Sequence, residues 1–398
     1  MTPPVQSSNQ TVWRRHVFFI SGFDPKGASH YYALYQAEAL KQSAVNGMAV
    51  QVGPRRRESD GSSSWTTRAV SPEARACETT YEFARWDDIV RQHWPRSTWR
   101  LLQDLLLAYA LMLSSGGIPT VWRLSRKTLV GLAYPLVVLG GGLALGMVLG
   151  VCAATALHGR GASWPVAMAA GLLLLVLASW CISKLEDKLN TTWLVRIFSF
   201  AGKQALGQLP ELETRLDAMA ARIKKKMRAN DVDEILIVGF SVGSILAVSA
   251  VARALCAIEK NEPGLNQPTL SLLTLGHCIP MLGLFPQAEV FREELGALAQ
   301  SEALNWMDFS SPTDWGSFAL VDPIKACKVL PPGQPVRNPV MRSPRFHTLF
   351  TSNSYALLRR NKRRMHLQYL MAGELPTGYD YFAITAGACT LFDRYHDR

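Results

Sequence analysis

The residues best suited to chemistry form the pentapeptide Gly239-Phe-Ser-Val-Gly243. It stands between an apolar run, Ile235–Gly239, and an Ala/Val-rich stretch, Ser244–Cys256, that contains neither Gly nor Pro. The first pattern predicts a buried strand and the second a helix. A serine on a sharp turn between such elements presents its hydroxyl above the sheet, and small flanking residues let the chain turn there. The pattern therefore predicts that Ser241 is a nucleophile.

A serine nucleophile needs a base to take its proton, an acid to orient that base, and N–H donors for the oxyanion. Beyond Ser241 the chain carries candidate acids and then candidate bases: Asp308, Asp314 and Asp322, followed by His347 and His366. One further histidine, His277, precedes all of these acids, and we expect it to cap a strand end.

The chain order nucleophile, acid, histidine resembles that of the α/β-hydrolase superfamily, in which the acid lies in the loop after a late strand. The resemblance covers roughly residues 12–45 and 205–398. The stretch Trp306–Trp315 is similar to that strand and loop, which favours Asp314 as the acid. Asp308 would lie inside the strand, and Asp322 stands in an Asp-Pro turn. Chain order favours His366 as the base, with His347 as the alternative.

The same resemblance implies two oxyanion donors. One is the backbone N–H of Val242, and the other belongs to Phe23 or Asp24 in the loop after the first strand. Lipases of this superfamily often carry His-Gly before that loop and a histidine in the elbow, whereas this chain has Ser21-Gly22 and Phe240. Neither difference removes a backbone donor, but the substrate of a particular lipase family does not transfer.

The elements that must position these residues alternate along the chain, which predicts a mostly parallel sheet flanked by helices. We expect an exposed hairpin or mobile loop at Gln51–Ser71. Helices are predicted at Tyr31–Gln42, Tyr81–Ser115, Leu209–Met227 and Ala288–Gln300, and strands at Val12–Ser21, Leu270–Gly276 and Leu304–Asp308.

Two segments, Leu129–Leu157 and Trp164–Ser183, contain no charged residue and are joined by six residues. Each reaches the ~18–20 residues that a helix needs to cross a bilayer. They predict an inserted transmembrane hairpin of two helices. The small residues on which these helices would approach closely are Gly140, Gly141, Gly142, Gly146 and Gly150.

Basic residues flank the hairpin on both sides, whereas its connecting loop holds a single one, Arg160. This asymmetry predicts an inner membrane with both termini and the hydrolase domain on the cytoplasmic side. Residues Met1–Arg15 do not resemble a signal peptide. The net charge of +11 is concentrated in Arg/Lys clusters, for which we expect anionic lipid headgroups of the bilayer as the partner, not nucleic acid.

These features predict a membrane-anchored serine hydrolase that cleaves a carboxylic ester, plausibly of a lipid or acyl chain, through an acyl-enzyme. An inactive binding scaffold and an acyltransferase with the same triad are the alternatives. No cofactor or metal is expected, because the seven cysteines are scattered and no phosphate loop or dinucleotide fingerprint occurs. The expected parts are residues 1–50 and 187–398 for the hydrolase domain, 51–127 for a loop and helical insertion, and 128–186 for the hairpin.

Overall fold

The computed structural model describes residues 11–396 except 59–60, 95–97, 115–116, 125–129, 131–132, 135, 190 and 258–267. The chain divides into two compact units. One comprises Met1–Trp94 together with Lys203–Arg398, and the other comprises Pro95–Gly202.

The first unit contains a nine-stranded sheet in its described part, with the order β2-β4-β5-β1-β6-β7-β8-β9 and with β3 paired to β4. From β5 to β9 all neighbouring strands are parallel, whereas β2, β3 and β4 make the antiparallel pairs. The predicted mostly parallel sheet is therefore confirmed. The strands are β1 (Arg14–Ile20), β2 (Ala49–Val52), β3 (Arg56–Arg57), β4 (Ser63–Val70), β5 (Ala76–Phe83), β6 (Glu234–Phe240), β7 (Thr269–Leu275), β8 (Asn305–Phe309) and β9 (Val340–Arg342).

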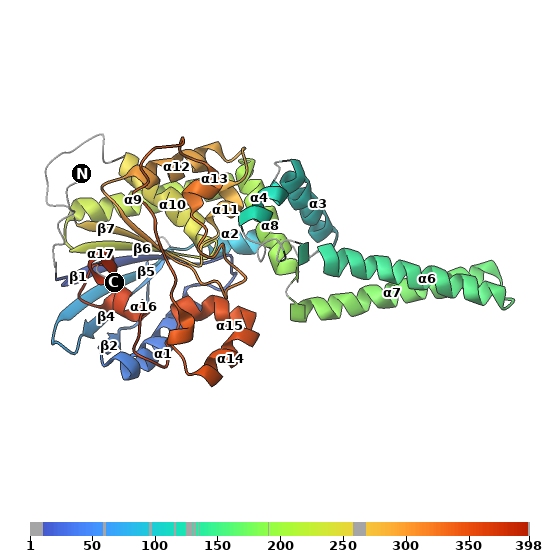
Figure 1. The fold of residues 1–398 in the computed structure, drawn as a ribbon, viewed down its shortest axis with the longest axis horizontal. Coiled ribbons are helices and arrows are strands. Elements are labelled where there is room, and N and C mark those ends of the chain that lie inside the picture. The colour runs from blue at the N-terminus through green and yellow to red at the C-terminus, as the bar shows by residue number, and fades with distance from the viewer. Residues whose placement is uncertain are drawn as a thin grey trace. The chain divides into compact units, whose positions relative to one another are not determined.

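Helices cover both faces of this sheet, as Figure 1 shows. The helices α9 (Pro210–Ala229), α10 (Gly243–Cys256) and α12 (Glu289–Gln300) lie on one face, and α1 (Ala28–Asn46) and α16 (Tyr381–Ala386) lie on the other. Because both faces are covered, every residue of the central strand β6 is buried, which explains its unbroken apolar run. The remaining helices of this unit are α2 (Asp87–Gln92), α11 (Ile279–Gly283), α13 (Pro323–Cys327), α14 (Ser352–Arg360), α15 (Lys362–Leu367) and α17 (Leu391–His396).

The predicted helix from Tyr81 to Ser115 is wrong at its start, because Tyr81 lies in β5 between β4 and β1. The Tyr81 ring is buried and stacks on Trp65 of β4, with ring centroids 4.5 Å apart. Of the two predictions for Gln51–Ser71, the hairpin is confirmed, because β2 and β3 pair antiparallel with β4, but it belongs to the sheet and alternate side chains of β4 are buried. Packing of aromatic and β-branched side chains across neighbouring strands determines the structure of this segment. The pattern within the segment alone predicts a helix and does not reveal those neighbours.

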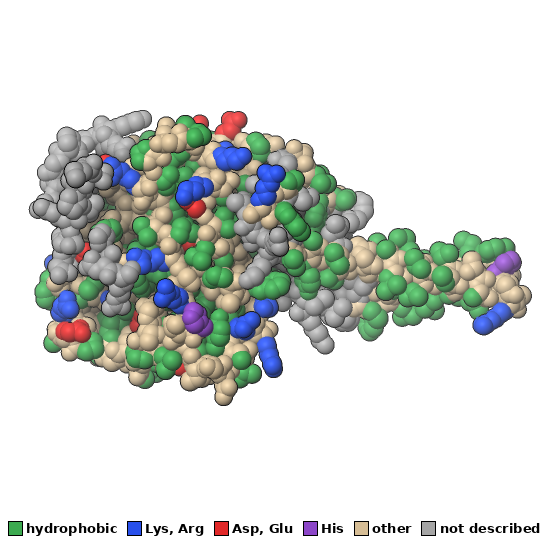
Figure 2. Space-filling model, in the orientation of Figure 1, with side chains coloured by type: hydrophobic (Ala, Val, Ile, Leu, Met, Phe, Trp, Pro, Cys, Tyr) green, Lys and Arg blue, Asp and Glu red, His purple; other side chains and the backbone are tan. Residues whose placement is uncertain are grey.

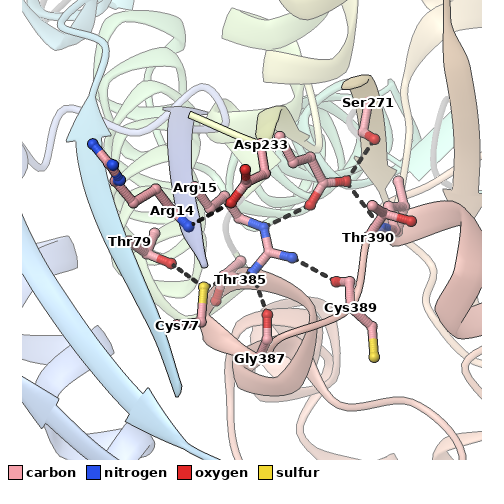
Figure 3. Close-up of polar contacts among 12 residues, drawn as sticks. Arg14, Arg15, Cys77, Thr79, Asp233, Ser271, Thr385, Gly387, Cys389 and Thr390 are labelled. Carbon is pink, nitrogen blue, oxygen red and sulfur yellow. Dashed lines mark hydrogen bonds and ion pairs between the residues drawn. The ribbon is translucent and has the colours of Figure 1, made fainter. Parts of the chain in front are cut away.

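A buried ion pair joins the amino-terminal ends of β1 and β6. Nε of Arg15 donates to Glu234 at 2.6 Å, and both side chains are 0% exposed. The two other guanidinium nitrogens of Arg15 donate to the carbonyl oxygens of Gly387 and Cys389 at 2.7 and 2.5 Å (Figure 3). Glu234 in turn accepts hydrogen bonds from the Ser271 hydroxyl and the Leu391 N–H. This network joins the C-terminal segment to the amino ends of β1 and β6.

The second unit contains two long apolar helices, α6 (Gly141–Gly159) and α7 (Trp164–Leu189), which pack tightly against each other. Glycines make this packing possible: a Cβ on Gly150 would lie 2.7 Å from the carbonyl oxygen of Gly171, and one on Gly146 would lie 2.9 Å from Cβ of Ala178. The predicted close approach is confirmed at Gly146 and Gly150, whereas Gly141 has open space around it. Parts of the first predicted span, residues 129, 131–132 and 135, lie outside the described residues.

Among the described residues, these two helices are long and apolar enough to cross a membrane. Most of their large apolar side chains, such as Leu145, Leu149 and Leu172, are exposed. The other helices of this unit are α3 (Thr98–Ser114), α4 (Gly117–Leu124) and α8 (Thr191–Ala205), with a π-helical turn at Leu136–Gly140 before α6.

Candidate active site

Ser241 occupies the turn between β6 and α10 with a φ of +56°, in the left-handed region that non-glycine residues seldom adopt. Close approach of the neighbouring chain requires the glycine after it: a Cβ on Gly243 would lie 2.3 Å from the carbonyl oxygen of Ile20. A Cβ on Gly239 would meet Ala247 at 2.7 Å. Both glycines of the pentapeptide are therefore needed for the turn, in which Ser241 is strained and only 2% exposed.

Backbone contacts hold this strained turn. The Ser241 N–H donates to the carbonyl oxygen of Leu275 at 2.8 Å, and the carbonyl oxygen of Ser241 accepts from the Ser244 hydroxyl at 2.6 Å. The Ser244 hydroxyl also accepts the N–H of Cys278 at 3.1 Å. Val242 is the N-cap residue of α10 and therefore precedes the intrahelical hydrogen bonds. The role of its N–H as an oxyanion donor stays a prediction.

Asp314 and His366 are in direct contact. Nδ1 of His366 lies 2.9 Å from Oδ2 and 3.0 Å from Oδ1 of Asp314. Asp314 lies in the loop after β8, and His366 lies on α15, whose N-terminus is capped by the Asn361 side chain. The carboxylate is 0% exposed, whereas the imidazole is 12% exposed. A carboxylate on Nδ1 fixes the tautomer and leaves Nε2 for proton transfer.

Further hydrogen bonds fix the Asp314 carboxylate in place. Its Oδ1 accepts the Gly316 N–H at 2.9 Å, and its Oδ2 accepts the Tyr369 hydroxyl at 3.1 Å. Burial by itself would raise the pKa of this carboxyl, but His366 and the hydrogen bonds from the Gly316 N–H and the Ser317 side chain hold the pKa below its usual value. Burial and the nearby Asp314 charge raise the pKa of Tyr369 well above its usual value, so its hydroxyl stays a donor. Asp314 is therefore an anion that can stabilise an imidazolium.

Ser241 lies beside this pair. The ring of Phe240, the residue before Ser241, packs on the His366 ring with centroids 5.0 Å apart. The Cys278 thiol lies 3.8 Å from Oγ of Ser241 and 3.5 Å from the carbonyl oxygen of Gly316. A hydrogen bond from Ser241 to Nε2 of His366, which an acyl-transfer mechanism requires, stays a prediction.

The loop after β1 packs directly on the elbow. A Cβ on Gly22 would lie 3.1 Å from Cβ and 3.5 Å from Oγ of Ser241. Phe23 is buried and stacks on Trp94, and the indole N–H of Trp86 donates to the carbonyl oxygen of Ser21. The Asp24 N–H donates to the carbonyl oxygen of Gly22 at 2.8 Å, which occupies that donor. The Asp24 N–H is therefore already engaged within the loop, and the oxyanion roles of Val242 and Phe23 stay predictions.

The other predicted candidates for the acid and the base contact different groups. Asp322 caps α13 by accepting the N–H groups of Ile324 and Lys325. Asp308 lies within β8, accepts the hydroxyls of Thr274 and Ser310, and stands 4.0 Å from Nε2 of His277. His277 lies two residues after the end of β7 and is fully buried. His347 is exposed, and its ring contacts Tyr355. The structure thus pairs Asp314 with His366 and not with these residues.

Sequence reasoning missed three residues of this site: Tyr369, Cys278 and Ser244. Tyr369 holds the Asp314 loop, because its oxygen also accepts the Ser311 N–H at 2.8 Å. Burial raises the pKa of the Cys278 thiol to about 12, so this thiol stays neutral beside Ser241. A signal for Tyr369 existed, since it follows His366 by three residues and so lies about one helical turn away. Cys278 and Ser244 carried no comparable signal.

No group of three or more His, Cys, Asp or Glu side chains that could hold a metal ion occurs among the described residues. No protein-family model, curated protein or solved structure matches this chain.

Proposed function

We propose that this protein is a membrane-anchored serine hydrolase of the α/β-hydrolase type that cleaves a carboxylic ester through an acyl-enzyme intermediate. The conformation of Ser241 carries the proposal: a serine at φ +56° on a turn closed by two sterically required glycines. Such strain persists only where the surrounding structure imposes it, and it concentrates at functional sites. The Asp314–His366 pair beside that turn supplies the other two groups that a serine nucleophile needs.

In the proposed first step, Nε2 of His366 takes the proton of the Ser241 hydroxyl while Oγ attacks the ester carbonyl carbon. The N–H groups of Val242 and Phe23 stabilise the negative oxygen of the tetrahedral intermediate. His366 then gives its proton to the leaving alcohol as the acyl–oxygen bond breaks, and Asp314 stabilises the transient imidazolium. In the second half, His366 deprotonates water, which attacks the acyl-enzyme, and the proton returns to Ser241 as the free acid leaves.

The apolar helices α6 and α7 support the membrane part of the proposal. Their length, their exposed apolar side chains and their glycine seam are typical of a transmembrane hairpin. The positive flanks then favour a cytoplasmic hydrolase domain. A site tethered beside the cytoplasmic leaflet favours esters of lipids or acyl chains as substrates.

The test is the rate of fluorophosphonate labelling of the full-length protein in membranes. We expect wild-type protein to be labelled and Ser241→Ala to be unlabelled, because the probe bonds to an activated serine oxygen. His366→Ala should lower the rate by roughly the 10²–10⁴-fold that general base catalysis contributes.

Two matched variants serve as controls. Ser43→Ala removes a hydroxyl that donates to Ala39 within α1, and His347→Ala removes the exposed histidine. Both should be labelled at the wild-type rate. A folded wild-type protein that is not labelled would refute the hydrolase proposal and favour a binding scaffold.

A further inference from the structure

Tyr369 places its hydroxyl on the carboxylate of the proposed catalytic acid. It lies in the 3-10 helix η3 (Gln368–Leu370), which directly follows α15, so it shares one short segment with His366. The Tyr369 hydroxyl lies 3.1 Å from Oδ2 of Asp314, and Nδ1 of His366 lies 2.9 Å from the same oxygen. Two side chains of one segment therefore hold one carboxylate oxygen.

The hydrogen bond between Tyr369 and Asp314 has a fixed direction. The pKa of Asp314 is held below its usual value, so its carboxylate is ionised and only accepts. Burial and the charge of Asp314 raise the pKa of Tyr369 well above its usual value, so the phenol keeps its one proton. The Tyr369 oxygen also accepts the Ser311 N–H at 2.8 Å. The proton of the phenol is therefore donated to Asp314.

Packing holds the Tyr369 ring in this position. The ring is fully buried and meets the Phe346 ring edge-on, with centroids 5.0 Å apart. Gly276, which follows β7, has a φ of +54°. A Cβ at this position would lie 2.8 Å from the Tyr369 ring and 3.1 Å from Oδ2 of Asp314. The backbone of Gly276 thus confines the ring and the carboxylate together, and the hydroxyl cannot turn away unless the ring moves.

The contact bears on the chemistry because Asp314 shares its negative charge among its donors. Its Oδ1 accepts the Gly316 N–H at 2.9 Å, and its Oδ2 accepts the Tyr369 hydroxyl. Each donor stabilises the carboxylate itself and leaves less of its charge to stabilise a protonated His366. The Tyr369 hydroxyl therefore acts on the proton that His366 takes from Ser241, although it does not touch the reacting atoms.

We propose that Tyr369 is a positioning residue that orients the Asp314 carboxylate toward His366 and limits how strongly this carboxylate holds a protonated imidazole. The inference rests on the proposed hydrolase function and adds a residue to its machinery. Because Tyr369 acts through Asp314, its removal should change the pH dependence of the reaction and not only its rate.

Other titratable groups near this centre come from neighbouring segments. Cys278 lies after β7, and burial raises the pKa of its thiol to about 12. Asp308 lies in β8, where burial raises the pKa of its carboxyl, and His277 stands 4.0 Å from it. Lys362 and Arg363 are exposed on α15 itself, and Figure 2 shows Lys and Arg side chains over this region. All of these groups remain in the variants below, so they cannot cause a difference between them.

The experiment measures the rate of fluorophosphonate labelling of the full-length protein in membranes at a series of pH values. The rate falls at acid pH because a protonated His366 cannot take the Ser241 proton. Tyr369→Phe removes only the hydroxyl, so the carboxylate should hold the protonated imidazole more strongly. The midpoint of the fall should move to higher pH by about half a unit, a roughly threefold change in the protonation equilibrium.

Tyr379→Phe is the matched control. The Tyr379 hydroxyl is also buried in the core and donates to the carbonyl oxygen of Tyr369 at 2.6 Å, but in the described structure it is not bonded to Asp314. Its loss should lower the stability by a similar amount and leave the midpoint at the wild-type pH. Urea unfolding of each variant shows whether it is folded.

Replacement of Tyr369 by 3-fluorotyrosine tests the same contact without removing it. The fluorine makes the phenol a stronger donor, so the carboxylate should hold the protonated imidazole less strongly. The midpoint should then move to lower pH, opposite to the shift in Tyr369→Phe. This replacement keeps the hydroxyl between Ser311 and Asp314, so it decides the question alone if Tyr369→Phe does not fold.

Opposite shifts for the two replacements of Tyr369, with no shift for Tyr379→Phe, would support this inference. Any other result with folded proteins would overturn it and leave the hydrolase proposal intact. An unmoved midpoint in Tyr369→Phe would mean that the hydroxyl is structural, and the same shift in Tyr379→Phe would mean that general loosening of the core causes it. If wild-type Ser241 is not labelled at all, the hydrolase proposal fails and this inference fails with it.

Discussion

One charged pair lies at the amino ends of the parallel strands, called the amino edge, and another lies beyond their carboxyl ends, called the carboxyl edge. The two pairs differ in how far their side chains are buried. At the amino edge, Arg15 and Glu234 are both 0% exposed, and each also bonds to the C-terminal segment. At the carboxyl edge, Asp314 is fully buried while His366 keeps 12% exposure. A pair enclosed on every side holds the chain together and cannot exchange protons readily. The His366 side chain is partly exposed although its Nε2 is buried, so the proposed proton transfer needs a substrate to reach that nitrogen inside the site.

The largest expected effect is a loss of activity, which should follow from a change in the carboxyl-edge pair and not in the amino-edge pair. Asp314→Asn keeps the shape of the side chain but removes the charge that orients and stabilises the imidazolium. The fluorophosphonate labelling rate should fall by roughly 10⁴-fold, as in serine hydrolases that lose this charge. Stopped labelling reactions at several times give this rate.

Asp322→Asn is the control for that variant, because Asp322 caps α13 and does not contact His366 in the described structure. It should keep the labelling rate. An Asp314→Asn protein that labels as fast as the wild type would show that the carboxyl-edge pair is structural, like its counterpart at the amino edge.

The second effect is a loss of stability, which should follow from a change in the amino-edge pair, Arg15 and Glu234. Glu234→Ala leaves the Arg15 guanidinium buried without a carboxylate partner. Burial alone would lower the pKa of Arg15, and Glu234 is the first of the partners that raise this pKa. Loss of one partner of a buried pair costs about 3–5 kcal/mol in the free energy of unfolding. Urea denaturation in detergent, followed by tryptophan fluorescence, measures it.

The double variant Arg15→Met with Glu234→Leu tests the reason for that loss. Replacement of both charges by apolar groups of similar size should restore part of the stability, because no buried charge is left unpaired. A double variant as unstable as Glu234→Ala would instead assign the stability to the hydrogen bonds with Gly387 and Cys389.

The smallest effect is a pH dependence within the carboxyl edge. The pKa of Asp314 is lowered in the folded protein, so its ionised form stabilises the fold above the unfolded value of about 4. This contribution is lost as the pH falls through the lower folded pKa. The stability difference between wild type and Asp314→Asn should therefore shrink as the pH falls below about 4.

Asp308 provides the opposite case within β8, the strand that precedes the loop of Asp314. Burial raises the pKa of its carboxyl, so its protonated form is favoured in the folded state. The stability of wild type relative to Asp308→Asn should fall as the pH rises above about 4, the reverse of the Asp314 result. Unfolding curves at a series of pH values measure both, and equal slopes for the two variants would contradict the difference in environment.

Much of the candidate site could be predicted because it is local in sequence. The turn around Ser241 follows from two glycines between an apolar run and a helix pattern, and the structure shows why each glycine is needed. Asp314 and His366 were chosen by chain order through a family resemblance, and the structure brings them into contact. Their catalytic roles stay predictions.

Other parts could not be read from local patterns. The strand at Tyr81 was taken for a helix, because its partners in β4 and β1 decide its structure. The pair of Arg15 and Glu234 joins residues 219 positions apart, and nothing near either residue indicates the other.

The sequence by itself determined the elbow, the two apolar helices and the alternation of strands and helices. Backbone sterics and hydrophobic periodicity act over a few residues and are written in consecutive positions. Only the tertiary structure decided which acid meets which histidine, which strands are neighbours and which charges are enclosed. Asp314 and His366 lie 52 positions apart, and the order of strands in the sheet and the packing of its loops set their distance.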